Sequence, residues 1–216
     1  MKNSTTLMAA LIAASATAAS AGVTTNGGFE SGAGADADNW NEIQIFGGSM
    51  GAAASAERSM ANPLSGDWAM DLSVTGAADF GPVAEIQQQT LVGSVVGGES
   101  YDFSFWATGI AGPGSVAFYE VIWFDGDGSN GGGPQGSATG LNTFALNDTY
   151  TQFGQSDLLA PTGADSVLIQ IRLVTGAFDG ASGSATIDDV SFSVVPAPAS
   201  LALLGLGGMC CARRRR

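Results

Sequence analysis

The chain has 216 residues, of which seven are basic, twenty are acidic and none is histidine, so its formal net charge is −13. Five of the basic residues lie close to the two ends, and only Arg58 and Arg172 lie within the part that carries all twenty acids, a net charge of −18 for that part. Such a surface repels nucleic acid and anionic lipid and attracts cations. This excludes a nucleic-acid role, while adaptation to a salty medium and a specific cation function both fit.

Several residue types needed for common enzyme chemistry are missing from the central part. It has no histidine and no lysine, and both cysteines, Cys210 and Cys211, lie near the C-terminus. Nucleophilic catalysis by Ser-His-Asp or Cys-His, histidine metal sites and Schiff-base chemistry are therefore excluded. Only a pair of carboxylates, as in glycosidases, stays available. The same part also lacks a disulfide, so another feature must stiffen it.

The first 21 residues have the pattern of a secretory signal peptide. Lys2 precedes an apolar run over residues 7–19, and the run closes on the small residues Ala19-Ser20-Ala21. This pattern predicts passage through a secretion translocase and removal by signal peptidase, which leaves Gly22 as the new N-terminus.

Residues 22–194 have a length suited to one domain with a real core. Helical periodicity is hard to find there, and short alternating or β-branched runs are separated by Gly, Asn, Asp and Pro. Eight such runs predict an all-β, antiparallel β-sandwich. They cover residues 42–46, 68–74, 84–92, 100–108, 116–124, 149–156, 166–174 and 184–194. Residues 125–148 are rich in glycine and are predicted to form a long surface loop.

Alternation within the runs predicts which side chains face the core. Tyr101, Phe103 and Phe105 share one face of their strand, and Trp106 lies on the other face with polar neighbours. Two further apolar rows are predicted to face the core. They are Val167, Ile169, Ile171 and Leu173, and Trp68, Met70, Leu72 and Val74.

Four segments, taken in order, carry a resemblance to a known family. They are Asn26-Gly-Gly-Phe-Glu-Ser-Gly followed by Trp40, then Gly98-Glu-Ser-Tyr-Asp-Phe-Ser-Phe-Trp-Ala, then Ala160-Pro-Thr-Gly-Ala-Asp-Ser-Val, and finally Ile187-Asp-Asp-Val-Ser-Phe192. Together they resemble secreted jelly-roll domains of the galactose-binding-like, carbohydrate-binding-module type. The resemblance implies a jelly roll over residues 22–194, while function still has to come from a site.

A calcium ion is the candidate for the stiffening feature that replaces a disulfide. Strand parity places Asp188 on the face of Val190 and Phe192, and a carboxylate that points toward a core is costly unless it is paired or binds a metal. The resemblance implies a structural Ca²⁺ held by Glu30 and Asp188, with backbone carbonyls as further hard oxygen ligands. The alternative is that Asp188 is solvated or capped by backbone amides.

A second acidic segment, Asp125-Gly-Asp-Gly-Ser-Asn130, begins like a calcium loop. It has Gly136 at the twelfth loop position, where an EF-hand needs glutamate. Asp-Gly after a strand favours an ordinary turn instead.

If the domain binds glycans, aromatic rings on a sheet face should stack on the sugars. Trp106 is the first candidate, Trp123 and Tyr119 on the next strand come second, and Trp40 in an early loop is third. The alternative for each of them is packing in the core.

The C-terminal segment, residues 195–216, has the layout of a sorting signal. An apolar run over residues 199–212 predicts a short transmembrane helix, and the arginines after it mark the cytoplasmic side. The layout resembles the PEP-CTERM signal of Gram-negative bacteria, although Ala197 stands where that motif has glutamate. The resemblance implies processing by exosortase, a membrane transpeptidase; an ordinary C-terminal anchor is the alternative. The signal comprises Val195, Pro196, Ala197, Pro198, Arg213, Arg214, Arg215 and Arg216.

These observations predict a non-catalytic protein, exported and membrane-anchored before processing, that binds extracellular polysaccharide at the cell surface or in the matrix. A structural surface or biofilm protein without a glycan ligand is the first alternative. A small glycosidase that uses two of the many acids is the second.

Overall fold

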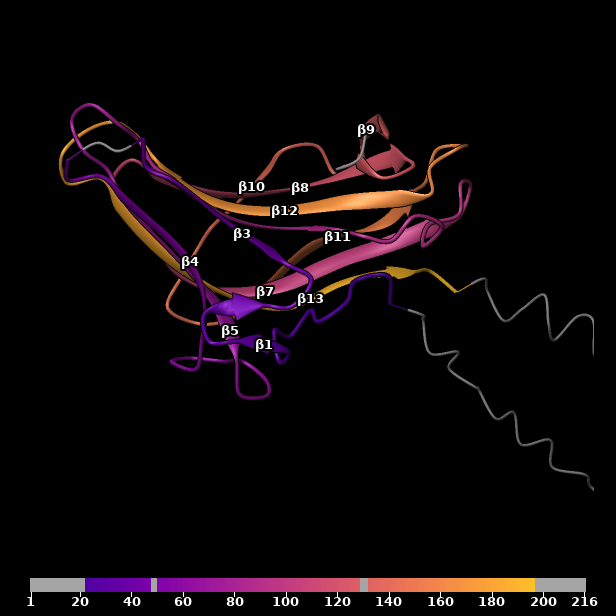
Figure 1. Ribbon diagram of the computed structural model, residues 1–216, viewed down its shortest axis with the longest axis horizontal. Helices are drawn as coiled ribbons and strands as arrows, with labels where there is room; N and C mark the ends of the chain where they lie inside the picture. The colour runs from indigo at the N-terminus through magenta and orange to yellow at the C-terminus, as the bar shows by residue number, and fades with distance from the viewer. Residues whose placement is uncertain (1–21, 48–49, 129–131, 197–216) are drawn as a thin grey trace, which may run out of the picture. The chain divides into compact units, whose positions relative to one another are not determined.

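The computed structural model describes residues 22–47, 50–128 and 132–196, and its strands are labelled β1 to β13. Two antiparallel sheets form the layers of a β-sandwich (Figure 1). The predicted all-β jelly-roll class is confirmed. The predicted signal peptide and most of the predicted sorting segment lie outside the described residues, and within those residues no helix is long and apolar enough to cross a membrane.

One layer is a six-stranded sheet with the order β10-β8-β12-β6-β3, to which β9 adds by pairing with β8. Its strands are β3 (Asn41–Ile45), β6 (Val83–Gln89), β8 (Ser115–Asp125), β9 (Gly133–Ser137), β10 (Asn142–Phe144) and β12 (Ser166–Thr175). The other layer has the order β11-β7-β13-β5-β4. Its strands are β4 (Ala53–Ser59), β5 (Ala69–Thr75), β7 (Ser100–Ala111), β11 (Thr151–Leu159) and β13 (Ser182–Val194). A two-stranded ribbon, β1 (Gly32–Ala33) with β2 (Asp36–Ala37), lies before β3 in the chain.

The core lies between the two layers and follows the predicted alternation. Phe103 and Phe105 of β7 are buried, as are Ile169 and Ile171 of β12. Tyr101 stacks on Phe192 of β13 with ring centroids 5.1 Å apart. Aromatic and aliphatic rows from both sheets thus bury each other, which is the main source of stability for such a fold.

The predicted loop over residues 125–148 is wrong in part, because it contains β9 and β10. Both strands pair with β8, β9 at its C-terminal end and β10 closer to its start. Neither shows strand-like alternation in sequence: β9 reads Gly-Pro-Gln-Gly-Ser and is exposed throughout. Backbone pairing to the long β8 holds these residues in the sheet.

The two ends of the described chain meet at one end of the sandwich. Gly22 forms a bridge with Ser193, and the Val23 N–H donates to the Phe192 carbonyl at 2.7 Å. The Val195 N–H donates to the Ser100 carbonyl at 2.8 Å. Residues 22 and 23, the N-terminus expected after signal-peptide cleavage, are therefore hydrogen-bonded to β13, the strand that leads into the sorting segment.

Truncating Phe192, the buried aromatic residue of β13, should destabilise the whole domain. We expect Phe192→Ala to lower the free energy of unfolding by about 3–5 kcal/mol, because it leaves a cavity beside Tyr101 and Trp123. Urea unfolding of the purified chain measures this loss. Ile110→Ala is the matched control, since Ile110 is exposed; equal losses in the two variants would contradict the described core.

Candidate functional site

Two rows of side chains cross the outer face of the six-stranded sheet. Residues directly opposite each other in antiparallel strands share a face, and the register aligns Phe118, Arg172, Glu85 and Ile43 in one row. The next row holds Glu120, Gln170, Gln87 and Asn41. We call these eight residues the cross-strand band. Both sheets bow in the same direction, so the face that carries the band is concave (Figure 1).

The centre of the band is a connected polar network. Arg172 Nε lies 2.8 Å from Glu85 Oε2, and its Nη2 donates to Glu85 Oε1 at 3.0 Å. The Gln170 amide donates to Glu85 Oε1 at 3.0 Å and to Gln87 Oε1 at 3.1 Å. Glu85 is only 4% exposed, whereas the Arg172 side chain is 27% exposed, so loss of the arginine would leave a buried carboxylate without its partner. The network therefore holds its side chains in place before any ligand arrives.

Apolar surface flanks the network. The Arg172 guanidinium lies 5.7 Å from the centre of the Phe118 ring. On the same face, Val174 and Val83 follow on one side of the band, and Ile122 and Leu168 follow on the other. The band crosses three inter-strand spacings, about 14 Å. Amide, carboxylate and guanidinium groups between apolar strips suit an extended ligand with both hydroxyl groups and C–H faces.

Trp106 lies on the outer face of the other sheet, as its parity predicts. It is partly exposed and pairs with Gln152 of β11. An open groove of about 400 Å³ continues from there. Its lining includes Asp102, Ser104, Gln152, Gly154 and Ser156. The role of Trp106 in ligand binding stays a prediction.

The other three predicted aromatic contacts are core residues in this structure. Trp123, Tyr119 and Trp40 are 3%, 5% and 5% exposed. Trp123 packs edge-on against Phe192, and Trp40 packs against Phe29. Burial also raises the pKa of Tyr119. No open ring face is left to stack on a sugar, so the alternative of core packing describes these three.

Asp188 does not share the face of Phe192, because a β-bulge interrupts β13. The register shifts between Asp188 and Ser191, and Asp189 has a left-handed φ of 49°. Asp188 therefore lies opposite Trp106 on the outer face. It is nevertheless fully buried, and that burial raises the pKa of its carboxyl group. The predicted parity was wrong, while the predicted desolvation of this acid is present.

One loop caps both predicted calcium ligands. The N–H groups of Leu64 and Ser65 donate to Asp188 Oδ2 at 2.8 and 3.1 Å. The N–H groups of Asp67 and Trp68 donate to Glu30 Oε1 at 3.0 and 3.1 Å. The structure thus brings both acids to residues 64–68 and shows the backbone capping that was weighed as an alternative.

Both acids also lie beside one glycine. A side-chain carbon on Gly28 would lie 3.4 Å from Asp189 Oδ1, 3.8 Å from Asp188 Oδ1 and 4.0 Å from Glu30 Cγ. Nearby, burial and the charges of Asp188 and other acids raise the pKa of Tyr150, which indicates a concentrated negative potential. Among residues 22–47, 50–128 and 132–196, no group of three or more Asp, Glu, His or Cys side chains could hold a metal. An ion here would need backbone carbonyls to complete its shell.

The segment after β8 begins as the ordinary turn that its Asp-Gly sequence favours. Gly126 has a left-handed φ of 83°, and its N–H donates to Asp165 Oδ1 at 2.7 Å. Residues 129–131 of this segment lie outside the described part of the chain.

Arg58, which sequence patterns did not single out, organises the loop that carries Glu30. Its Nε and Nη2 atoms donate to the carbonyls of Phe29 and Glu30, both at 2.6 Å. Its guanidinium lies 3.6 Å from the centre of the Trp68 ring, so Trp68 is a cation–π partner and not the core residue predicted by parity. The sequence could have pointed to Arg58, because it is one of two basic residues within residues 22–194.

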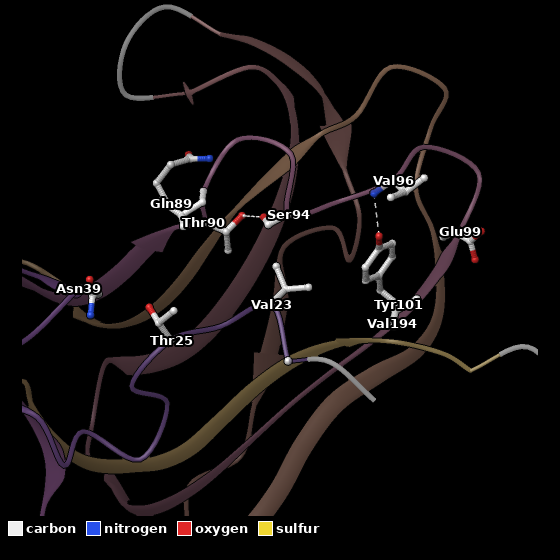
Figure 2. Close-up of a pocket in the computed structure, with 12 residues that line it drawn as sticks. Val23, Thr25, Asn39, Gln89, Thr90, Ser94, Val96, Glu99, Tyr101 and Val194 are labelled. Carbon is white, nitrogen blue, oxygen red and sulfur yellow. Dashed lines mark hydrogen bonds between the residues drawn. The ribbon is translucent and has the colours of Figure 1, made fainter. Parts of the chain in front are cut away.

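A pocket lies where the chain enters and leaves the sandwich. Figure 2 shows this pocket, of about 710 Å³, between the N-terminal segment, the loop after β6 and the end of β13. Tyr101 Oη accepts the Val96 N–H at 2.8 Å at its edge. Its lining includes Val23, Leu91, Val96 and Val194, with Glu99 as the single charged residue.

Comparison with protein families identifies the C-terminal segment. Residues 194–216 match the PEP-CTERM protein-sorting motif. The chain carries a PEP-CTERM sorting signal. The predicted resemblance is confirmed, although only Val195 and Pro196 of the signal residues lie in the described structure.

Solved structures share the fold of the body. A family 61 carbohydrate-binding module in complex with β-1,4-galactotriose has a TM-score of 0.51 at 16% identity, covering 81% of this chain and 99% of that one. The enzymatically active domain of a tailspike protein of bacteriophage CBA120 has a TM-score of 0.56 at 18% identity, covering 81% of this chain and 21% of that one. The chain thus spans about a fifth of the tailspike chain. Comparison with curated proteins gives no match.

The guanidinium of Arg58 should not be replaceable by an ammonium group. We expect Arg58→Lys to lower the free energy of unfolding by about 2 kcal/mol, because lysine cannot serve both carbonyls and the Trp68 ring at once. Chemical denaturation measures it. Ser59→Ala, a change on the same strand, is the control; a loss in Arg58→Lys no larger than in the control would contradict the described contacts.

Proposed function

We propose that this protein is an exported, non-catalytic surface protein whose β-sandwich binds a polysaccharide along the cross-strand band. Two observations support export and a fold suited to carbohydrate binding. The chain carries the PEP-CTERM signal, and its body has the fold of carbohydrate-binding modules. The arrangement of polar and apolar side chains in the cross-strand band is the main observation behind the proposed binding of a polysaccharide.

The chemistry of the band fits a neutral sugar chain. The C–H faces of sugar rings pack on apolar and aromatic surface, here Phe118 and the flanking aliphatic side chains. The hydroxyl groups would meet donors and acceptors in the partly exposed Gln87 and Arg172, which the buried Gln170 and Glu85 hold in place. The family 61 module of the same fold binds β-1,4-galactotriose, a ligand of this class. The net charge of −18 on residues 22–194, with two arginines and twenty acids, disfavours an anionic glycan.

Delivery to the surface follows from the two ends of the chain. We propose that a translocase and signal peptidase act at the N-terminus, and that residues 199–212 then stop in the membrane with the arginines on the cytoplasmic side. An exosortase-type transpeptidase would next remove this helix and pass the body to the cell surface or the extracellular matrix.

Substitutions in the band should weaken glycan binding. We expect Phe118→Ala and Gln87→Ala each to lower the affinity of the purified chain for its best polysaccharide about tenfold, or about 1.4 kcal/mol, because each removes one contact from the band. Affinity electrophoresis against a neutral polysaccharide panel measures this. Trp106→Ala, on the outer face of the other sheet, is the matched control.

The outcomes separate the alternatives. Loss of binding in Trp106→Ala with full binding in Phe118→Ala would move the site to the groove beside Trp106. A chain that binds no polysaccharide would leave the structural surface role, and release of reducing sugar would indicate a glycosidase.

We also propose that Glu30 and Asp188 hold a structural Ca²⁺. Carboxylate oxygens at the two ends of the domain are the hard ligands this ion prefers, and the negative potential around them favours a cation. Bound there, the ion would offset the desolvated charge of Asp188 and fasten the N-terminal loop to β13.

Calcium should therefore stabilise the folded chain. At a concentration 100 times its dissociation constant, we expect a gain of about 2.7 kcal/mol, seen as a higher thermal midpoint that a chelator reverses. Asp188→Asn should lose this calcium-dependent shift, whereas Asp125→Asn, at the end of β8, should keep it. An equal shift in both variants, or none in the unaltered chain, would refute the site.

A further inference from the structure

Exposed aliphatic residues gather at the end of the sandwich where the chain leaves it. Leu91, Val92, Val96 and Leu159 have exposed fractions of 78%, 55%, 58% and 66%. We call these four residues the exit surface. A soluble domain seldom exposes several large aliphatic side chains together unless they contact a partner.

Pocket lining, sequence position and strand pairing place all four residues at the end of the sandwich where the chain leaves it. Leu91 and Val96 line the pocket together with Val194, the last residue of β13. Figure 2 shows Val96 and Val194 at this end of the sandwich. Val92 directly follows Leu91 in the same loop. Leu159 pairs with Ser100, whose carbonyl accepts the Val195 N–H.

The chain allows little distance between this surface and the membrane. Val195 makes the last described hydrogen bond of the body, and only Pro196, Ala197 and Pro198 separate it from the apolar run that begins at residue 199. Fully extended, this connection spans about 14 Å. β13 has thirteen residues and is about 40 Å long. With residues 199–212 in the membrane, as proposed above, this short connection would keep the exit end near the bilayer, whereas the far end could stand well away from it.

We propose that the exit surface contacts the lipid bilayer while the sorting tail is attached. The four aliphatic side chains would enter the interfacial layer and hold the body upright on the membrane. The strongly acidic body disfavours anionic lipid, while the pocket lining adds only Glu99 as a charge. The partner is thus a bilayer rich in neutral, zwitterionic lipid. This inference rests on the proposed insertion of residues 199–212.

Depth-dependent quenching tests the contact. The chain from Gly22 to Arg216 is placed in phosphatidylcholine vesicles that contain brominated lipid, with one fluorescent cysteine label per chain. Leu91→Cys reports the exit surface, and Ile110→Cys is the matched control at the far end of β7; both are made with Cys210→Ser and Cys211→Ser. Cys211→Ser alone leaves Cys210 as a reporter of the tail.

We expect quenching of the labels at positions 91 and 210 and none at position 110. Quenching at 210 with none at 91, or equal quenching at 91 and 110, would overturn the exit surface and leave the anchor intact. No quenching at 210 would overturn the anchor as well. Binding of polysaccharide is measured separately, so its failure would not affect this result.

A second arm tests the choice of lipid. Replacing half of the phosphatidylcholine by phosphatidylglycerol should reduce quenching at position 91, because the acidic body is repelled, while the buried tail reporter at Cys210 keeps its signal. Unchanged quenching at 91 would overturn the preference for neutral lipid.

Discussion

The burial of two inward-facing rows against each other is the interaction on which the rest of this protein depends. Phe103 and Phe105 from one sheet and Ile169 and Ile171 from the other exclude water along the length of the sandwich. Residues 22–194 contain no cysteine, so no disulfide can share this task. Everything on the outer faces, including the candidate binding band, is positioned by strands whose inner faces are held in this way.

Positive charge is scarce in the body, and each of its two arginines organises one place. Arg58 fixes the loop that carries Glu30 through two backbone carbonyls. Arg172 joins Glu85 at the centre of the concave face. A guanidinium suits both tasks, because its planar fork serves two acceptors and its face can lie on an aromatic ring. One arginine therefore serves the architecture, and the other builds a surface with recognisable binding chemistry.

The sequence predicted the fold class and the core rows because strand alternation is a local signal. It missed the bulge at Asp188, since one inserted residue reverses parity without changing the residue types. It also missed the network on the concave face. Glu85 and Arg172 are far apart in sequence, and only the pairing of β6 with β12 makes them neighbours. Aromatic residues drew attention as sugar platforms, yet three of the four fill the interior, where large rings gain most from burial.

The place of β13 within its sheet affects the order of events during export. This strand lies between β7 and β5 and is the last strand of the domain, so the five-stranded sheet cannot close until the chain up to residue 194 is available for pairing. The N-terminal segment emerges first, yet its hydrogen-bond partner at Phe192 emerges near the end. In the export route proposed above, folding would be completed only as the sorting signal itself reaches the translocase. An exosortase-type enzyme acting on this signal would then meet a chain whose last strand has just become available to complete the domain.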